Sequence, residues 1–142
     1  MLRVLIADND LSLCRSLKTY LEESAGMEVV GIAPDGEQTL TMIQAHEPDV
    51  VILDVTMPHL DGLGVLEKLD TLQIQKRPHI IVLTAFGRED IIRRFTEMNV
   101  DYFIVKPFDM EVLAERICQF AGDDTRQGVV KPSVLTNGSA SS

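Results

Sequence analysis

Four side chains with reactive chemistry stand at or just after the ends of short apolar segments of the sequence. They are Asp8, Asp54, Thr84 and Lys106. Two carboxylates held close together repel each other, and a nearby cation is needed to keep both ionised. A hard divalent cation such as Mg2+ prefers oxygen ligands, often one or two carboxylates together with waters and phosphate oxygens. These residue types therefore predict phosphoryl chemistry at a metal site.

Each of the four residue types suits a different role in that chemistry. The Asp54 carboxylate could attack a phosphoryl group as a nucleophile and form an aspartyl-phosphate. Lys106 and the metal would offset the charge on the phosphoryl oxygens, and the Thr84 hydroxyl could hydrogen-bond one of them. All of this requires the four groups to meet in one place.

Five short apolar runs, rich in β-branched and aromatic residues, are expected to form the strands that position these groups. They lie at 4–7, 29–33, 50–53, 80–83 and 102–105. Near-continuous apolarity is typical of strands buried on both faces, which implies a parallel sheet. Segments with apolar residues at helical spacing follow each run. We therefore predict an α/β fold, a (βα)5 doubly wound parallel sheet with right-handed crossovers.

The predicted sheet brings the four polar side chains to one edge. Ligands of open α/β sheets bind outside the carboxyl ends of the strands, near the point where the strand order reverses. With a strand order of 2-1-3-4-5, the strands that end near the four residues are neighbours. The four side chains would then converge on one cleft.

The composition excludes several classes of protein. The 142 residues include 13 Lys and Arg against 22 Asp and Glu, and the net charge of −9 argues against a nucleic-acid-binding surface. No apolar run approaches the roughly 18–20 residues that span a bilayer, and the first residues lack a signal-peptide pattern. Cys14 and Cys118 are too few for a disulfide framework. We expect a cytoplasmic protein with no membrane contact and no direct nucleic-acid binding.

The sequence changes character at Gly122. From there on the residues are mostly small and polar, and the apolar exceptions are Val129, Val130, Val134 and Leu135. Such a composition suits a flexible tail or interdomain linker. We predict a phosphoacceptor domain over 1–121 and a tail over 122–142 that adds no element to the core.

The chain resembles the receiver domains of response regulators over residues 2–121. The resemblance is carried by Asp8, by Asp54 with the stretch 55–62, by Thr84 with its neighbours 83 and 85, and by Lys106 with 107–108. These separated motifs agree with the family in order and spacing. Stretches 57–62, 83–90 and 102–111 are closer still to the sporulation regulators of endospore-forming bacteria. The resemblance implies the flavodoxin-like strand order 2-1-3-4-5.

The resemblance also implies roles for individual residues. Asp54 corresponds to the phosphoacceptor, Thr84 to the switch hydroxyl and Lys106 to the lysine of the family pattern. Phe103 corresponds to the aromatic residue that moves inward when the hydroxyl engages phosphate. The Lys106-Pro107 bond is expected to be cis, against a base rate for X–Pro bonds of about 5–6%.

The implied metal site departs from the family pattern at one position. Asp8, Asp54 and the backbone carbonyl of Thr56 would hold Mg2+ or another divalent cation such as Ca2+ or Mn2+. Receivers usually carry two adjacent acids after the first strand, but here Asn9 takes the second place. An amide oxygen can bind the metal without a full negative charge, so we expect weaker affinity. Asp10 is expected to cap the following helix instead.

The leading functional hypothesis is a phosphorylation-activated signalling domain, not an enzyme with an external substrate. A histidine kinase or histidine phosphotransfer protein would supply the phosphoryl group, and an effector domain outside this chain, expected to be a transcription regulator of sporulation, would respond. The chain would be a monomer that forms a phosphorylation-dependent or domain-swapped homodimer. Two alternatives remain: a pseudo-receiver that acts only through protein contacts, favoured by Asn9, and an aspartate-nucleophile phosphohydrolase. Such hydrolases place a second acid two residues after the nucleophile, where this chain has Thr56.

Overall fold

The strands of the protein form one parallel sheet. The computed structural model describes residues 1–85, 88–121 and 133–135, the last three by their backbone alone. The strands are β1 (Arg3–Ala7), β2 (Glu28–Ala33), β3 (Val50–Asp54), β4 (His79–Ala85), β5 (Tyr102–Lys106) and β6 (Ser133–Leu135). Their order is β2-β1-β3-β4-β5-β6, and every neighbouring pair is parallel. The predicted order 2-1-3-4-5 is confirmed.

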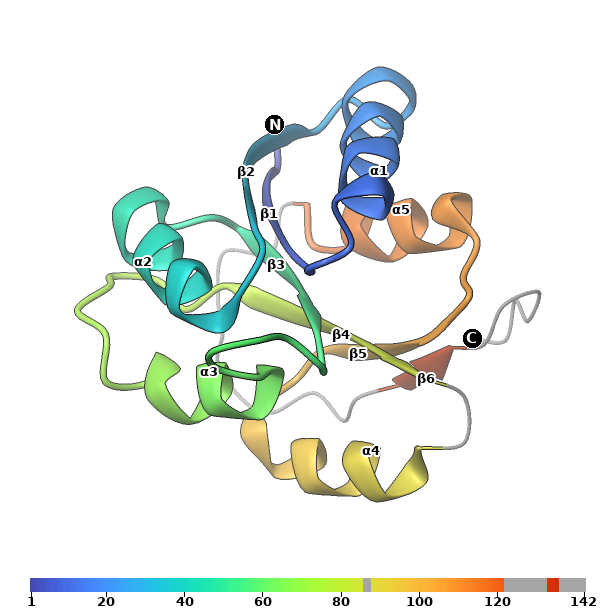
Figure 1. The fold of residues 1–142 in the computed structure, drawn as a ribbon. Coiled ribbons are helices and arrows are strands. Elements are labelled where there is room, and N and C mark those ends of the chain that lie inside the picture. Colours follow the sequence, from blue (N-terminus) through green and yellow to red (C-terminus); the bar gives the residue numbers. More distant parts are fainter. Residues whose placement is uncertain (86–87, 122–132, 136–142) are drawn as a thin grey trace.

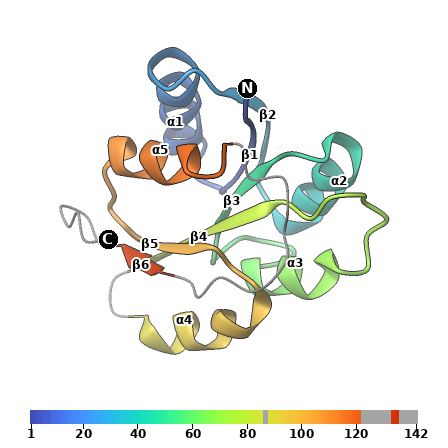
Figure 2. The ribbon, with the colours of Figure 1, turned by 180° about the vertical axis from the view of Figure 1, so that it is seen from behind.

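Helices cover both faces of the sheet (Figures 1 and 2). They are α1 (Leu11–Ser24), α2 (Gly36–His46), α3 (Gly62–Leu69), α4 (Glu89–Phe95), the 3-10 turn η1 (Thr96–Met98) and α5 (Met110–Cys118). The buried residues of α1 and α5 pack against one face, and those of α2, α3 and α4 pack against the other. Because β3 lies between two covered faces, all five of its residues are buried, as its continuous apolar sequence predicts.

Aspartate side chains cap the start of four of the five α-helices in the described part of the chain. Asp10, Asp35, Asp61 and Asp109 each accept a hydrogen bond from a backbone N–H in the first turn of the helix that follows. Such caps satisfy N–H groups that have no partner within the helix. The predicted cap role of Asp10 is therefore confirmed, with its carboxylate 3.1 Å from the Leu13 nitrogen.

The strand β6 corrects the expectation that residues 122–142 add no element to the core. Its three residues pair in parallel with β5, so that Tyr102 lies opposite Ser133 and Phe103 opposite Val134. Two apolar residues in a row are too short a run to predict a strand, but the open edge of β5 offers them a complete set of backbone partners. Residues 122–132 and 136–142 lie outside the described part of the chain.

No helix among residues 1–85 and 88–121 is long and apolar enough to cross a membrane.

Candidate functional site

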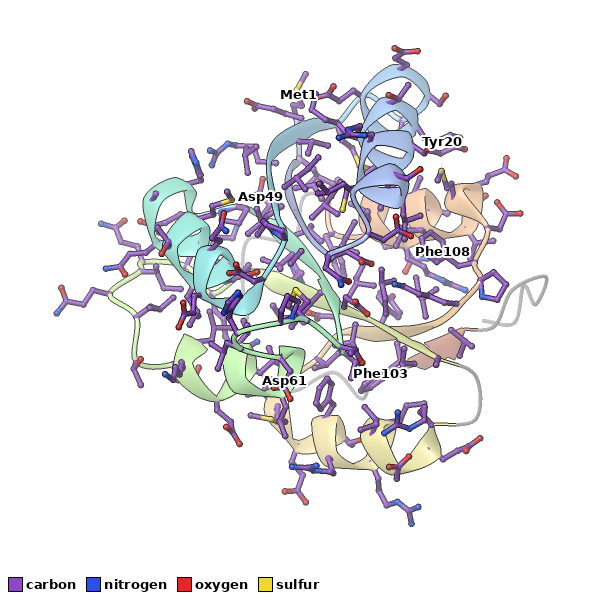
Figure 3. All side chains as sticks on the ribbon, in the orientation of Figure 1. Met1, Tyr20, Asp49, Asp61, Phe103 and Phe108 are labelled. Carbon is purple, nitrogen blue, oxygen red and sulfur yellow. The ribbon has the colours of Figure 1, made fainter. Side chains whose placement is uncertain are left out.

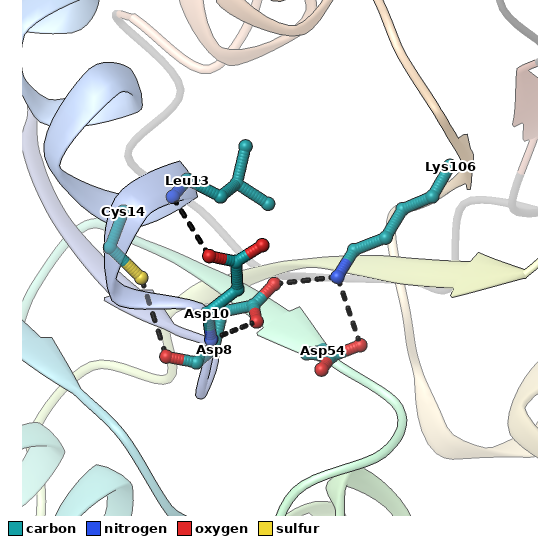
Figure 4. A network of polar contacts seen from close by, with 6 residues as sticks. All are labelled: Asp8, Asp10, Leu13, Cys14, Asp54 and Lys106. Carbon is teal, nitrogen blue, oxygen red and sulfur yellow. Dashed lines mark hydrogen bonds and ion pairs between the residues drawn. The ribbon is translucent and has the colours of Figure 1, made fainter.

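The four reactive side chains meet at the carboxyl edge of the sheet, as the strand order predicts. Asp8 directly follows β1, Asp54 is the last residue of β3, Thr84 lies one residue before the end of β4, and Lys106 ends β5. These four strands are consecutive in the sheet. Figure 4 shows Asp8 and Asp54 facing the amine of Lys106.

Lys106 joins the two carboxylates. Its Nζ donates a hydrogen bond to Oδ2 of Asp8 at 2.7 Å and lies 3.5 Å from Oδ1 of Asp54. The other carboxylate oxygen of Asp8 accepts the backbone N–H of Asp10 at 2.9 Å. Asp8 is 1% exposed and Asp54 is 7% exposed. One lysine therefore offsets the charge of two carboxylates that water hardly reaches.

The environment shifts the pKa values of this cluster. Burial, followed by the negative charge of Asp8, raises the pKa of Asp54 to about 6, although the charge of Lys106 and the backbone N–H of Thr56 act in the opposite direction. Burial opposes the charge on Lys106, but its hydrogen bond to Asp8 and the charge of Asp54 outweigh burial and raise the pKa of the amine. At neutral pH the pair therefore consists of an ionised Asp54 and a protonated Lys106.

Thr84 brings a hydroxyl that is free for a ligand. The residue is 2% exposed, and its Oγ1 has no hydrogen-bond partner among the described residues, which omit 86 and 87. A buried polar atom without a partner is costly, and a role in the chemistry of the site is one of the explanations for such an atom. Backbone pairing between β3 and β4 sets Asp54 opposite Leu83, next to Thr84. An oxygen of a group attached to Asp54 is a suitable partner for this hydroxyl.

The donor set at this edge fits a hard divalent cation. Asp8 and Asp54 offer carboxylate oxygens, and Asn9 and Thr56 are exposed beside them. In the described part of the chain, no group of three or more His, Cys, Asp and Glu side chains is placed to hold a metal ion. Two carboxylates with neutral oxygens and waters nevertheless match Mg2+, which keeps several waters in its shell. Asp10 is engaged as a helix cap and is not a further acid for this set.

Phe103 lies in the core on the side of α4. Figure 3 shows Phe103 on the side of the sheet that faces α4. Phe103 is fully buried, and its ring packs against that of Phe95 with 6.3 Å between the ring centres. Its backbone pairs with Val82, two residues before Thr84. The Lys106-Pro107 bond is cis, as expected.

Two residues that support the site escaped prediction. The Cys14 thiol donates to the backbone carbonyl of Asp8 at 3.3 Å, and burial raises its pKa to about 12, so it stays a neutral thiol. Gly62 lies so close to β3 that an added Cβ would stand 2.7 Å from the carbonyl oxygen of Asp54. The helical periodicity around Cys14 indicates burial, but only the structure shows which backbone group each residue holds.

The chain matches known proteins over most of its length. A family model described as the response regulator receiver domain matches residues 4–118. The Francisella response regulator 1452 receiver domain is 28% identical with a TM-score of 0.77, and the match covers 88% of this chain and 100% of that chain. The receiver domain of AraT, a response regulator from Geobacillus stearothermophilus, is 29% identical with a TM-score of 0.71, and the match covers 83% and 91% of the two chains.

Proposed function

The chain belongs to the response regulator receiver family, and on that premise we propose that it is a switch that accepts a phosphoryl group on Asp54. Receiver domains are signalling domains that pair with histidine kinases and with effector domains. The observation that carries the proposal is the bridge from Lys106 to both Asp8 and Asp54 at the carboxyl edge of the sheet. This bridge holds the ionised, largely buried carboxylate of Asp54 beside the Lys106 ammonium. The same ammonium could pair with a phosphoryl oxygen once the group is attached to Asp54.

The transfer step is a displacement at phosphorus. An Oδ atom of Asp54 forms the new P–O bond while the P–N bond to the donor imidazole breaks, and the leaving imidazole keeps the electron pair and takes up a proton from solvent. Lys106 remains protonated and pairs with a phosphoryl oxygen, which lowers the barrier because the charge develops beside a fixed cation. The Thr84 hydroxyl donates to another phosphoryl oxygen. Mg2+ held by Asp8 and Asp54, with Asn9 and Thr56 adding neutral oxygens, would supply further positive charge there.

The conformational change that follows phosphorylation of Asp54 involves β4 and β5. Once Thr84 turns toward the phosphoryl group, the packing beside Phe103 changes, and the helices that cover these strands adopt a second arrangement. The contact between Phe103 and Phe95 of α4 supports this route, because it joins the switch aromatic directly to one of those helices.

The biological setting is a finer part of the proposal. The similarity of stretches 57–62, 83–90 and 102–111 to stage-zero sporulation regulator A supports a cytoplasmic phosphorelay that controls sporulation. The phosphodonor would be a histidine kinase or histidine phosphotransfer protein. Residues 122–142 would lead to a DNA-binding effector, and phosphate on Asp54 would favour a homodimer of an otherwise monomeric domain.

Two residues, Thr56 and Asn9, bear on the two alternative functions. A phosphohydrolase needs an acid two residues after its nucleophile, and Thr56 supplies none. A pseudo-receiver remains favoured by Asn9, which removes one charge from the metal site. Both rivals predict that Asp54 keeps no phosphoryl group.

Beryllofluoride, a mimic of the phosphoryl group, distinguishes these functions. NMR spectra of the protein with Mg2+ and beryllofluoride should show changes at Asp54, Thr84 and Phe103, and Asp54→Asn should abolish them because it removes the attachment point. Asp10→Asn is the matched control, since it changes a nearby exposed carboxylate and keeps a good helix cap. Spectra that do not change in the wild-type protein would favour the pseudo-receiver.

A further inference from the structure

A cluster of rings holds the C-terminal end of α5 against the edge of the sheet opposite Asp54. His79 is the first residue of β4, Tyr102 is the first residue of β5, and Phe120 follows α5 by two residues. We call His79, Tyr102 and Phe120 the α5 clasp. These residues take no part in the chemistry at Asp54, which lies at the other end of the strands.

The first contact of the α5 clasp is a stack between His79 and Phe120. Their ring centres are 3.8 Å apart and their planes are within 10° of parallel. His79 is 2% exposed, and its Nδ1 lies 3.4 Å from the carboxylate of Asp101, which in turn accepts the backbone N–H of Ile80 at 2.8 Å. The contact with Asp101 and the stack with Phe120 thus hold the imidazole ring of His79 in one orientation.

The second set of contacts comes from Tyr102. Its hydroxyl donates to Oε1 of Gln119 at 2.6 Å, and its ring centre lies 5.7 Å from that of Phe120. The guanidinium of Arg116 stands 5.7 Å above the same ring, within range of a cation–π contact. One side chain of β5 therefore contacts Arg116 in the last turn of α5 and the two residues that follow the helix, Gln119 and Phe120.

The two strands that hold the end of α5 also carry the reactive groups. β4 runs from His79 to Thr84 and beyond, and β5 runs from Tyr102 through Phe103 to Lys106. A shift of the whole of β5 against β4 would move Tyr102 relative to His79, because these residues begin neighbouring strands of the sheet. Phe120 contacts the rings of both His79 and Tyr102, so it cannot keep both contacts when these two rings move relative to each other.

The strand β6, which lies beyond α5 in the sequence, also contacts the α5 clasp. Ser133 of β6 lies opposite Tyr102 in the parallel ladder, so the backbone of Tyr102 contacts a segment well beyond α5 while its side chain donates to Gln119, the residue directly after α5. Tyr102 therefore contacts described residues before and after 122–132, namely Gln119, Phe120 and Ser133. Any change in the position of Tyr102 reaches the chain beyond α5 by two routes.

Resting on the proposed function, we infer that the α5 clasp is the output coupling of the domain: it transmits the state of Asp54 to the C-terminal end of α5 and the chain that follows. Without a phosphoryl group the contacts of the clasp are all made. A second arrangement of β4 and β5 therefore loosens them, and the end of α5 opens more readily. Tyr102 and His79 act as positioning residues and touch no reacting atom.

Hydrogen exchange of residues 113–121 tests the inference on the full chain, with and without Mg2+ and beryllofluoride. In the wild-type protein we expect exchange there to become at least about fivefold faster on loading, the lower end of usual coupling between two sites. Phe120→Leu removes the shared ring and should abolish the difference. Tyr102→Phe removes only the phenol oxygen and should reduce it, which preserves the test if Phe120→Leu does not fold. Tyr20→Phe makes the same change on α1 and should leave the difference intact.

The outcomes separate the coupling from the phosphorylation. Intact mass after treatment with acetyl phosphate reports in parallel whether Asp54 in each variant takes a phosphoryl group. If the variants are phosphorylated normally and lose the exchange difference, the inference stands. A full difference in Tyr102→Phe and Phe120→Leu, or none in the phosphorylated wild-type protein, overturns the inference alone. A wild-type protein that takes no phosphoryl group overturns the proposed function, and the inference with it.

Discussion

Lys106 and Asp8 are 98 positions apart in the sequence, and the amine of the first donates to the carboxylate of the second at 2.7 Å. The same amine lies 3.5 Å from Asp54. Asp8 makes the shorter contact and is 1% exposed, so it fixes the lysine, whereas Asp54 makes the longer contact and is 7% exposed. Within the proposed function, this asymmetry suits different tasks for two carboxylates of the same type: Asp8 would position the charge of the lysine and Asp54 would react.

The free energy of unfolding should depend on pH because the pKa of Asp54 is raised in the folded protein. Its pKa of about 6 lies above the ordinary value of 3.8, so the folded protein binds this proton more tightly than the unfolded chain does. Ionised Asp54 therefore costs about 3 kcal/mol of stability above about pH 6, and the cost fades as the pH falls toward about pH 4. In a chelator, Asp54→Asn should be more stable than the wild-type protein at about pH 7.5 by up to this amount.

Denaturant unfolding of both proteins across this pH range measures the effect. The stability difference between them should shrink steadily as the pH falls from about 6 to about 4, since both proteins then carry a neutral group at this position. A stability difference that stays constant with pH, or a variant less stable at neutral pH, would contradict the assigned pKa.

Asn9→Asp should tighten Mg2+ binding. The change restores a second acid directly after Asp8 and adds a charge at an exposed position beside the two buried carboxylates. A contact to a charged group contributes about 1.5–3 kcal/mol, which corresponds to roughly ten- to hundredfold in affinity. Calorimetric titration measures it, with Asn99→Asp as the control that adds the same charge after α4. Equal affinities of Asn9→Asp and the wild-type protein would refute a role for this position.

Asp10→Ala should destabilise the fold and spare the chemistry. The carboxylate caps α1 by accepting the Leu13 N–H, so its loss costs about 0.5–2 kcal/mol. Asp10→Ser should recover most of that stability, because serine is also a good cap. Thermal unfolding and acetyl phosphate labelling measure the two properties. A large loss of labelling in a folded Asp10→Ala would mean that this acid belongs to the metal site.

A chain that ends at Gly122 should fold and accept a phosphoryl group. The truncation removes β6, which adds three residues at the edge of the sheet beyond β5 and touches none of the four reactive residues through its backbone pairs. Sedimentation of the full and truncated chains, with and without phosphodonor, should show monomers that dimerise on phosphorylation. Unfolding of the shorter chain would instead mean that the core needs the tail in order to fold.

The sequence predicts the sheet and the meeting of Asp8, Asp54, Thr84 and Lys106 because each follows an apolar run and parallel strands bring their carboxyl ends to one edge. The unequal sharing of Lys106 could not be predicted, since it depends on differences of less than an ångström in position. For the same reason no pattern indicates that Thr84 Oγ1 lacks a partner among the described residues.

Other features depend on contacts between distant segments. The α5 clasp joins residues 79, 102 and 120, each of which reads as an ordinary core or edge position by itself. The strand β6 is stabilised by the open edge of β5 and not by its own short apolar run. The backbone pairing of β6 depends on a strand that is distant in the sequence. Local composition indicates only that the residues around β6 are mostly polar.

The most direct test is the intact mass of the protein after treatment with acetyl phosphate and Mg2+, followed by mapping of the modified peptide. The account predicts one added phosphoryl group, located on Asp54, with none in Asp54→Ala and an undiminished yield in Asp10→Asn. Labelling that persists in Asp54→Ala, or a phosphoryl group found on another residue, would contradict it.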